Sequence, residues 1–136
     1  DTSALIKRYV EEDGTEYVDA LWEDCWGVAT SVVAFAEAMS AFCRKWREGL
    51  LSGKEHSATV KKFKDDYEHL ILVPLDNDLN SLMENLFNRH PLRGFDAIHL
   101  ASALVFANSK ETDLFFACFD KTLNKAARKE GLKSRP

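Results

Sequence analysis

The sequence lacks several features that would each place it in a specialised class of protein. It has only three prolines and six glycines in 136 residues, which excludes collagen-like and linker-rich chains. No apolar run approaches the length of a membrane-spanning helix, so we expect no membrane partner. No C-x-x-C pair occurs among its three cysteines, which excludes a zinc ribbon and a thioredoxin-type motif. These absences leave one globular domain over residues 1–136.

Two further absences concern the surroundings of the protein and its charge. The sequence shows no signal peptide and does not begin with methionine. We therefore expect a cytoplasmic protein whose sequence is trimmed at its N-terminus. The formal net charge of −4 excludes a uniformly basic coat for nucleic acid, but not a local basic patch.

The charge that is present is unevenly distributed along the chain. Residues 1–24 carry eight acidic side chains and two basic ones, whereas residues 121–136 carry six basic side chains and one acidic one. The net charge thus averages an acidic start and a basic end. Solvated helix faces are the simplest interpretation of most of these residues.

Short apolar strands alternate with longer helices along the chain. Strands are predicted at 27–30, 70–73 and 114–119, the last of them fully buried. Helices are predicted at about 2–10, 15–24, 32–49, 54–68, 77–88, 94–108 and 120–130, and the expected caps are Thr2 or Ser3, Ser31 and Asp76. This alternation predicts an α/β fold with a parallel sheet covered on both faces. In such folds a site lies beyond the carboxyl ends of the strands.

Glu37 is the most informative acidic residue of the sequence. It is the only charged residue in the apolar helical stretch 32–42. A lone buried carboxylate is costly unless it is paired, protonated or bound to a metal. Alternatively, Glu37 lies on the exposed stripe of its helix and pairs with Arg44, which shares that face.

Three aspartates occupy strand ends or helix starts. Asp96 follows a glycine at the start of a predicted helix, and Asp120 ends the predicted strand 114–119. Asp1 precedes a predicted helix, and it would end a strand if one came before it. Each of the three taken alone is explained by a helix N-cap, since a helix N-terminus favours an acid.

Taken together, these four carboxylates predict a shared site as well as helix caps, because they can converge at one edge of a parallel sheet. Oxygen-rich clusters of this kind hold Mg²⁺ or Mn²⁺. Such an ion can activate a water and stabilise in-line displacement at phosphorus, which needs no nucleophilic side chain. The predicted site consists of Asp1, Glu37, Asp96 and Asp120.

Four segments resemble, in order, the acidic motifs of PIN domains, especially the VapC-like toxins of bacterial and archaeal toxin–antitoxin pairs. They are DTSALIKRY from Asp1, SVVAFAEAMSAFCR around Glu37, FDAIHLASAL around Asp96 and FDKTLNKAARKEGL around Asp120. Each motif is loose alone, but the ordered set is fairly specific and spans residues 1–132.

The resemblance implies a three-layer α/β/α sandwich with a central parallel sheet, of which the first strand is truncated here. It implies a Mg²⁺- or Mn²⁺-dependent endoribonuclease with the four acids as catalytic and metal-binding residues. It further implies an RNA substrate, a homodimer and a cognate antitoxin whose C-terminal segment covers the site. The sequence departs from the family in the missing strand before Asp1 and in Cys118, which stands where a hydroxyl residue is often found.

Other side chains near the four acids are candidates for substrate contact, since an acidic site needs cations to hold an RNA backbone. The candidates are Ser3, Arg44, Lys45, Arg47 and Arg93, with Lys121 and Lys125 as further options. Ser3 could instead orient Asp1 or cap a helix, and the cations could be solvated surface charges. His99 is interpreted as a packed structural histidine rather than a general base.

Two rival functions fit the sequence less completely. The first is a PIN-like interaction module without catalysis. The second is an aspartyl-phosphate enzyme, which would need a second aspartate two residues after Asp1, where the sequence has Ser3.

Overall fold

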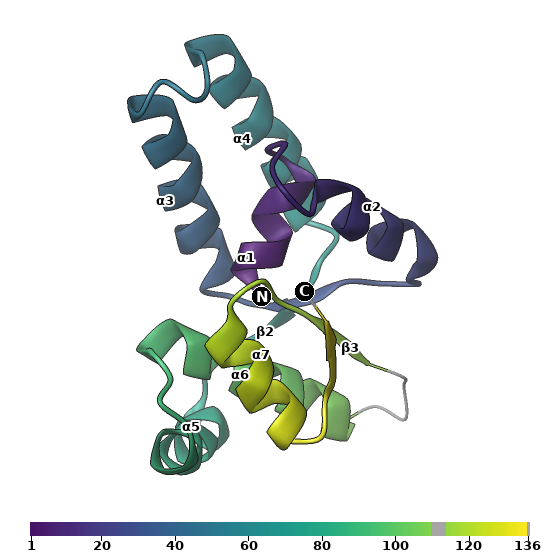
Figure 1. Ribbon diagram of the computed structural model, residues 1–136, viewed down its shortest axis with the longest axis vertical. Helices are drawn as coiled ribbons and strands as arrows, with labels where there is room; N and C mark the ends of the chain where they lie inside the picture. The colour runs from purple at the N-terminus through teal and green to yellow at the C-terminus, as the bar shows by residue number, and fades with distance from the viewer. Residues whose placement is uncertain (110–113, 136) are drawn as a thin grey trace.

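The computed structural model describes residues 1–109 and 114–135 (Figure 1). The helices of the first half are α1 (Thr2–Leu5), the 3₁₀ helix η1 (Ile6–Arg8), α2 (Thr15–Asp24), α3 (Ala34–Arg47) and α4 (Gly53–Tyr67). Those of the second half are α5 (Asn77–Arg89), α6 (Gly94–Ser109) and α7 (Lys121–Lys129). The strands are β1 (Ala29–Ser31), β2 (Ile71–Val73), β3 (Phe115–Ala117) and β4 (Lys133–Arg135). Residues 1–109 and 114–135 contain no helix that could span a membrane.

Most helices begin where their capping residues predict. Asp76 caps α5 by accepting a hydrogen bond from the Leu79 amide, and Ser52 and Glu55 form a capping box at the start of α4. Two predicted caps are wrong. Asp1 rather than Thr2 or Ser3 caps α1, because its carboxylate accepts the Ser3 amide.

Ser31 is the second wrong cap, since it is the last residue of β1. Helix α3 follows Val33, which makes no side-chain cap. The predicted helix over 2–10 is also shorter than expected, and it is divided into α1 and η1. Strand β4 was not predicted, because Lys133 and Ser134 are polar and carry no strand signal.

The strands form two separate parallel pairs. β1 pairs with β2, with Ala29 opposite Ile71, and β3 pairs with β4, with Phe115 opposite Lys133. The parallel pairing is as predicted for an α/β fold. One central sheet is not formed by the described residues, since the two pairs are not hydrogen-bonded to each other.

The buried apolar side chains form two hydrophobic cores. The first, which we term the aromatic core, packs α1, α3 and α4 together and consists of Leu5, Val10, Ala34, Ala38, Phe42 and Phe63. The second, the aliphatic core, packs α5, α6 and α7 against β3 and consists of Leu79, Leu86, Leu100, Ala101, Phe116, Cys118, Leu123, Ala126, Ala127 and Leu132. Figure 1 shows α3 and α4 extending together as an arm away from α5, α6 and α7.

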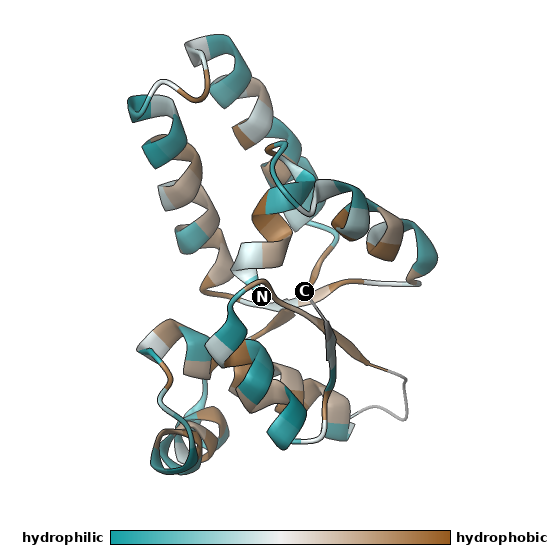
Figure 2. Cartoon of the chain, viewed as in Figure 1, coloured by the Kyte–Doolittle hydropathy of each residue, from teal (hydrophilic) through white to brown (hydrophobic). Residues whose placement is uncertain are grey.

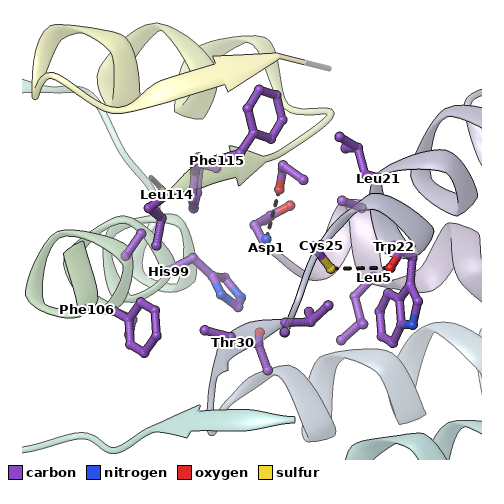
Figure 3. A pocket seen from close by; sticks show the side chains of 18 of the residues that line it. Asp1, Leu5, Leu21, Trp22, Cys25, Thr30, His99, Phe106, Leu114 and Phe115 are labelled. Carbon is purple, nitrogen blue, oxygen red and sulfur yellow. Dashed lines mark hydrogen bonds between the residues drawn. The ribbon is translucent and has the colours of Figure 1, made fainter. Parts of the chain in front are cut away.

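A pocket of ≈ 450 Å³ lies between the two strand pairs, where β1 and β3 both line it. Its walls are mainly apolar and include Leu5, Val18, Phe106 and Phe116. Figure 3 shows Asp1 and His99 at this pocket, facing the same space as Phe106 and Leu114. Phe115 also lines the pocket and is 37% exposed, although the strand at 114–119 was predicted to be fully buried.

Candidate functional site

Asp1 is held at the end of β3 by its own backbone and by Ser3. The Asp1 nitrogen donates to the Ala117 carbonyl at 2.9 Å. Its Oδ1 accepts the Ser3 amide at 2.9 Å and also the Ser3 hydroxyl. The Ser3 hydroxyl in turn accepts the Phe119 amide at 2.9 Å. Ser3 therefore orients Asp1 and ties it to the strand end before Asp120.

Glu37 is neither unpaired nor bonded to Arg44. It lies in the first turn of α3, and its Oε2 accepts hydrogen bonds from the Thr2 hydroxyl at 2.7 Å and from His99 Nε2 at 2.6 Å. Thr2 and His99 come from α1 and α6, so this contact joins three helices. Arg44, the alternative partner, is exposed.

The pKa shifts of this pair agree with a neutral imidazole donating to a carboxylate. Burial raises the pKa of Glu37, but the hydrogen bonds from His99 and Thr2 outweigh it and hold the pKa below its ordinary value. Burial lowers the pKa of the His99 imidazole, and the bond to Glu37 only partly opposes this. His99 is 3% exposed, which agrees with the predicted structural role.

Asp96 lies in the first turn of α6, three residues before His99. Its Oδ2 accepts the Arg93 amide at 3.3 Å, a bond back to the residue before the helix, so Asp96 is a first-turn acid rather than the N-cap. Its negative charge also acts on the His99 imidazole. Asp96 is partly exposed, and the neighbouring Phe95 is 54% exposed.

Asp120 caps α7, with its Oδ1 accepting the Leu123 amide at 2.8 Å. The Cys118 sulfur accepts the Asp120 amide at 3.3 Å, so this thiol still contacts the backbone of the fourth acid. The ring of Phe119, which lies between Cys118 and Asp120 in the sequence, packs on Gly14, where a Cβ would clash with it. Gly14 also has a φ of +94°, so both its backbone and its neighbour favour glycine there.

The four predicted acids share one arrangement. Each has one carboxylate oxygen bonded to the protein, and the other oxygen has no partner among residues 1–109 and 114–135; the bonded atoms are Asp1 Oδ1, Glu37 Oε2, Asp96 Oδ2 and Asp120 Oδ1. Hard oxygen atoms that are oriented but uncommitted are the donor type that Mg²⁺ and Mn²⁺ prefer. The donor chemistry therefore fits such an ion.

The four acids do not lie close enough together to form one metal site. Within the part of the chain that the structure describes, no three His, Cys, Asp or Glu side chains lie close enough together to hold one metal ion. The structure brings Glu37 together with His99 and Asp1 together with Ser3, but it does not bring the four carboxylates into one ligand set. Thr2, taken from sequence only as a possible cap, is the partner of Glu37 that sequence reasoning missed.

The predicted basic contacts lie at different distances from these acids. Arg93 is exposed beside Asp96, and its backbone amide contacts that carboxylate. Arg44 and Arg47 are also exposed, but they lie in the last turns of α3, on the arm. Arg44 is about 10 Å along the helix from Glu37 at 1.5 Å per residue. Lys45 is committed to Glu12, at 2.8 Å.

The pocket between β1 and β3 is distinct from the acids as a group. Asp1 and His99 line it, whereas Glu37, Asp96 and Asp120 do not. Its walls are mainly apolar, which does not suit a charged substrate.

Comparison with known proteins identifies the family. The PIN domain model matches residues 1–129. The chain is 29% identical over 136 residues to "Ribonuclease VapC45" of Mycobacterium tuberculosis (strain CDC 1551 / Oshkosh), and equally to "Ribonuclease VapC49" of strain ATCC 25618 / H37Rv. Both alignments cover all of this chain and 92% of the relative. The chain belongs to the PIN domain family, as its four motifs predict.

Proposed function

We propose that this PIN-domain protein is an endoribonuclease, the toxin of a toxin–antitoxin pair, with its site at Asp1, Glu37, Asp96 and Asp120. The observation that carries the proposal is the shared arrangement of these acids, each oriented through one oxygen and uncommitted at the other. The names of the two mycobacterial relatives, both ribonucleases, support the same reaction class.

We further propose that the reaction depends on Mg²⁺ or Mn²⁺ and that the free carboxylate oxygens of these residues are its donors, although the described residues do not bring three of them into one ligand set. When bound, such an ion would activate water and stabilise charge on the phosphate. The protein itself fixes the donors. Thr2 and His99 keep Glu37 ionised and oriented, and Ser3 fixes Asp1. The first turn of α7 fixes Asp120.

The test is cleavage of a structured RNA with Mn²⁺ and with EDTA. We expect wild-type cleavage only with the metal, and no detectable cleavage by Asp96→Asn or Glu37→Gln. Asp78→Asn is the matched control for Asp96, because Asp78 is likewise an acid in the first turn of a helix but lies on α5. Full activity of both site variants would refute the proposal.

The non-catalytic module is the second candidate, and the spacing of the acids is the observation that favours it. Calorimetric titration of the protein with Mn²⁺ separates the two functions. Saturable binding that Asp96→Asn weakens and Asp78→Asn does not supports the nuclease, whereas no binding together with no cleavage supports the module.

We propose that the partners are an RNA substrate, a cognate antitoxin and a second copy of the chain. The α3–α4 arm supports a protein partner, since Trp46 and Leu50 are 48% and 65% exposed near its tip. Light scattering on the purified protein tests the homodimer. A short reading frame upstream that encodes a DNA-binding protein, and its co-purification with this chain, would test the antitoxin.

We also propose that the two strand pairs are halves of one sheet in a three-layer sandwich. The gap between β1 and β3, bordered by apolar side chains of α2 and α6, supports this arrangement. Adding an apolar extended segment before Asp1 should raise the melting temperature, and a polar segment of equal length should not. Equal melting temperatures would count against a strand in the gap.

A further inference from the structure

The exposed face of α7 carries a basic stripe, which we define as Lys121, Lys125, Arg128 and Lys129. At 3.6 residues per turn these four positions fall within an arc of about 100°. The opposite face of the helix is buried in the aliphatic core through Leu123, Ala126 and Ala127. The stripe borders an open groove of ≈ 430 Å³, and Figure 2 shows the hydrophilic side of α7 turned away from the core.

The charge of the stripe is little neutralised by the protein. Lys121, Lys125 and Lys129 form no ion pair with any residue that the structure describes. Glu130 is the only acid after Asp120 in the sequence. Its carboxylate is occupied by Arg89 at 3.0 Å and His90 at 2.5 Å. The groove is therefore a site of positive potential.

The basic stripe begins next to Asp120, one of the four acids of the candidate site. Lys121 directly follows Asp120, the cap of α7. From Lys121 to Lys129 the stripe extends about 12 Å along the helix, at 1.5 Å per residue. A polyanion that lies along it would reach Asp120 with one end.

The exposed side chains of α7 favour a nucleic acid over an acidic protein as the partner of the stripe. Thr122 is the only exposed residue of α7 outside the stripe, so this face offers no apolar anchor. The centre of a protein–protein interface relies on buried aromatic or aliphatic anchors. Nucleic-acid interfaces are more polar and more positively charged.

We propose that the basic stripe of α7 binds the sugar–phosphate backbone of the RNA substrate and guides it to Asp120. This inference rests on the proposed ribonuclease function and adds the path of the substrate. It assigns RNA contact to α7, in addition to the arginines of α3 and to Arg93.

The test measures binding of a fluorescent single-stranded RNA in EDTA, across a range of salt concentrations, so that cleavage plays no part. For single strands, each phosphate contact contributes about 0.7 to the slope of log affinity against log salt. The triple variant Lys121→Gln/Lys125→Gln/Lys129→Gln should therefore reduce that slope by about 2 and weaken binding about tenfold at low salt. Glutamine keeps a good helix propensity, and circular dichroism checks the fold.

The matched control is Lys54→Gln/Lys61→Gln/Lys64→Gln, which removes three exposed charges from α4 on the arm. It should bind RNA with the wild-type slope. Wild-type affinity and slope in the α7 variant would overturn the inference. It would also be overturned if the α7 variant lost binding to polyglutamate but not to RNA, which would assign the stripe to an acidic protein. RNA binding that depends on α7, without cleavage in Mn²⁺, would support the stripe and reject only the nuclease.

Discussion

The two halves of the molecule are stabilised in different ways, although each contains one parallel strand pair. In the first half, a few aromatic rings hold α3 and α4 together, with Phe63 in edge contact with Tyr9 at 5.4 Å and with Phe42 at 5.5 Å. In the second half, the core consists mainly of leucine and alanine side chains, most of them from α5, α6 and α7.

The halves meet through polar contacts that involve the candidate site. Glu37 belongs to the first half and His99 to the second, and their hydrogen bond is one of several between the halves. The Asp1 nitrogen also donates to the Ala117 carbonyl, and the Phe119 amide to the Ser3 hydroxyl. Apolar packing thus stabilises each half, and these hydrogen bonds contribute to positioning the halves relative to each other. A substitution can therefore weaken the packing within one half, remove a hydrogen bond near the contact between the halves, or leave both unchanged.

The largest effect should come from the aromatic core. Phe63→Ala removes a fully buried ring that contacts Tyr9 and Phe42, and we expect the free energy of unfolding to fall by about 3–5 kcal/mol. Chemical denaturation measures the loss, and hydrogen exchange of α3 and α4 locates it. Equal loss of protection in α5 and α6 would mean that the molecule has one core rather than two.

A smaller loss of stability should follow when the hydrogen bond that supports Glu37 is removed. Thr2→Val keeps the shape of a buried side chain but removes the hydroxyl that donates to Glu37. We expect a loss of about 1–2 kcal/mol in denaturation, together with a higher pKa for Glu37 in an NMR titration. Thr30→Val is the matched control, since its buried hydroxyl has no hydrogen-bond partner. An unchanged Glu37 pKa in Thr2→Val would show that the hydroxyl does not hold the carboxylate.

An ion-pair network within the first half should contribute about 1 kcal/mol. Glu12 accepts from Lys7 at 3.0 Å and Lys45 at 2.8 Å, and both lysines are mostly buried. Burial raises the pKa of Glu12, but the bonds from Lys45 and Lys7 outweigh it and hold the pKa below 4.5. A depressed pKa stabilises the fold above pH 4.5, and this contribution is lost as the pH falls.

Glu12→Gln should therefore lower stability by about 1 kcal/mol at pH 7 and flatten the decline below pH 4.5. Thermal unfolding of both proteins across this pH range measures the difference. Parallel curves would show that Glu12 is not responsible for that part of the acid sensitivity.

The smallest effect is expected at the corresponding ion pair of the second half. Arg89 is 53% exposed at its side chain, and Glu130 keeps His90 as a partner when Arg89 is removed. Arg89→Gln should change the free energy of unfolding by less than about 0.5 kcal/mol, as for most surface pairs. A loss as large as that of Glu12→Gln would remove the contrast between the two networks.

Some elements in each half were predicted from the sequence more closely than others. Local signals located α2, α5 and α6 closely, because Asp76 is a strong cap and Gly94 marks a helix start. The four motifs identified the family, as the PIN domain match confirms. Local signals were weaker for β4, whose stability depends on pairing with β3 rather than on its own residues.

The site was predicted residue by residue but not in its contacts. An acid inside an apolar helix indicated that Glu37 needs a partner, yet nothing local shows that the partners come from α1 and α6. Those contacts depend on how three helices cross, which is a property of the whole fold. Whether Asp1, Glu37, Asp96 and Asp120 act together remains the prediction that the cleavage assay addresses.

The order of the strand pairs has a consequence for synthesis on the ribosome. β3 and β4 are separated by one helix, whereas β1 and β2 are separated by the whole α3–α4 arm. Closing the longer loop costs only about 0.6 kcal/mol more per doubling of its length, so each pair can form as soon as its second strand is made. The β1–β2 pair can thus form while the second half is still being translated. Asp96 and Asp120 emerge last, and the candidate site is complete only in a nearly finished chain.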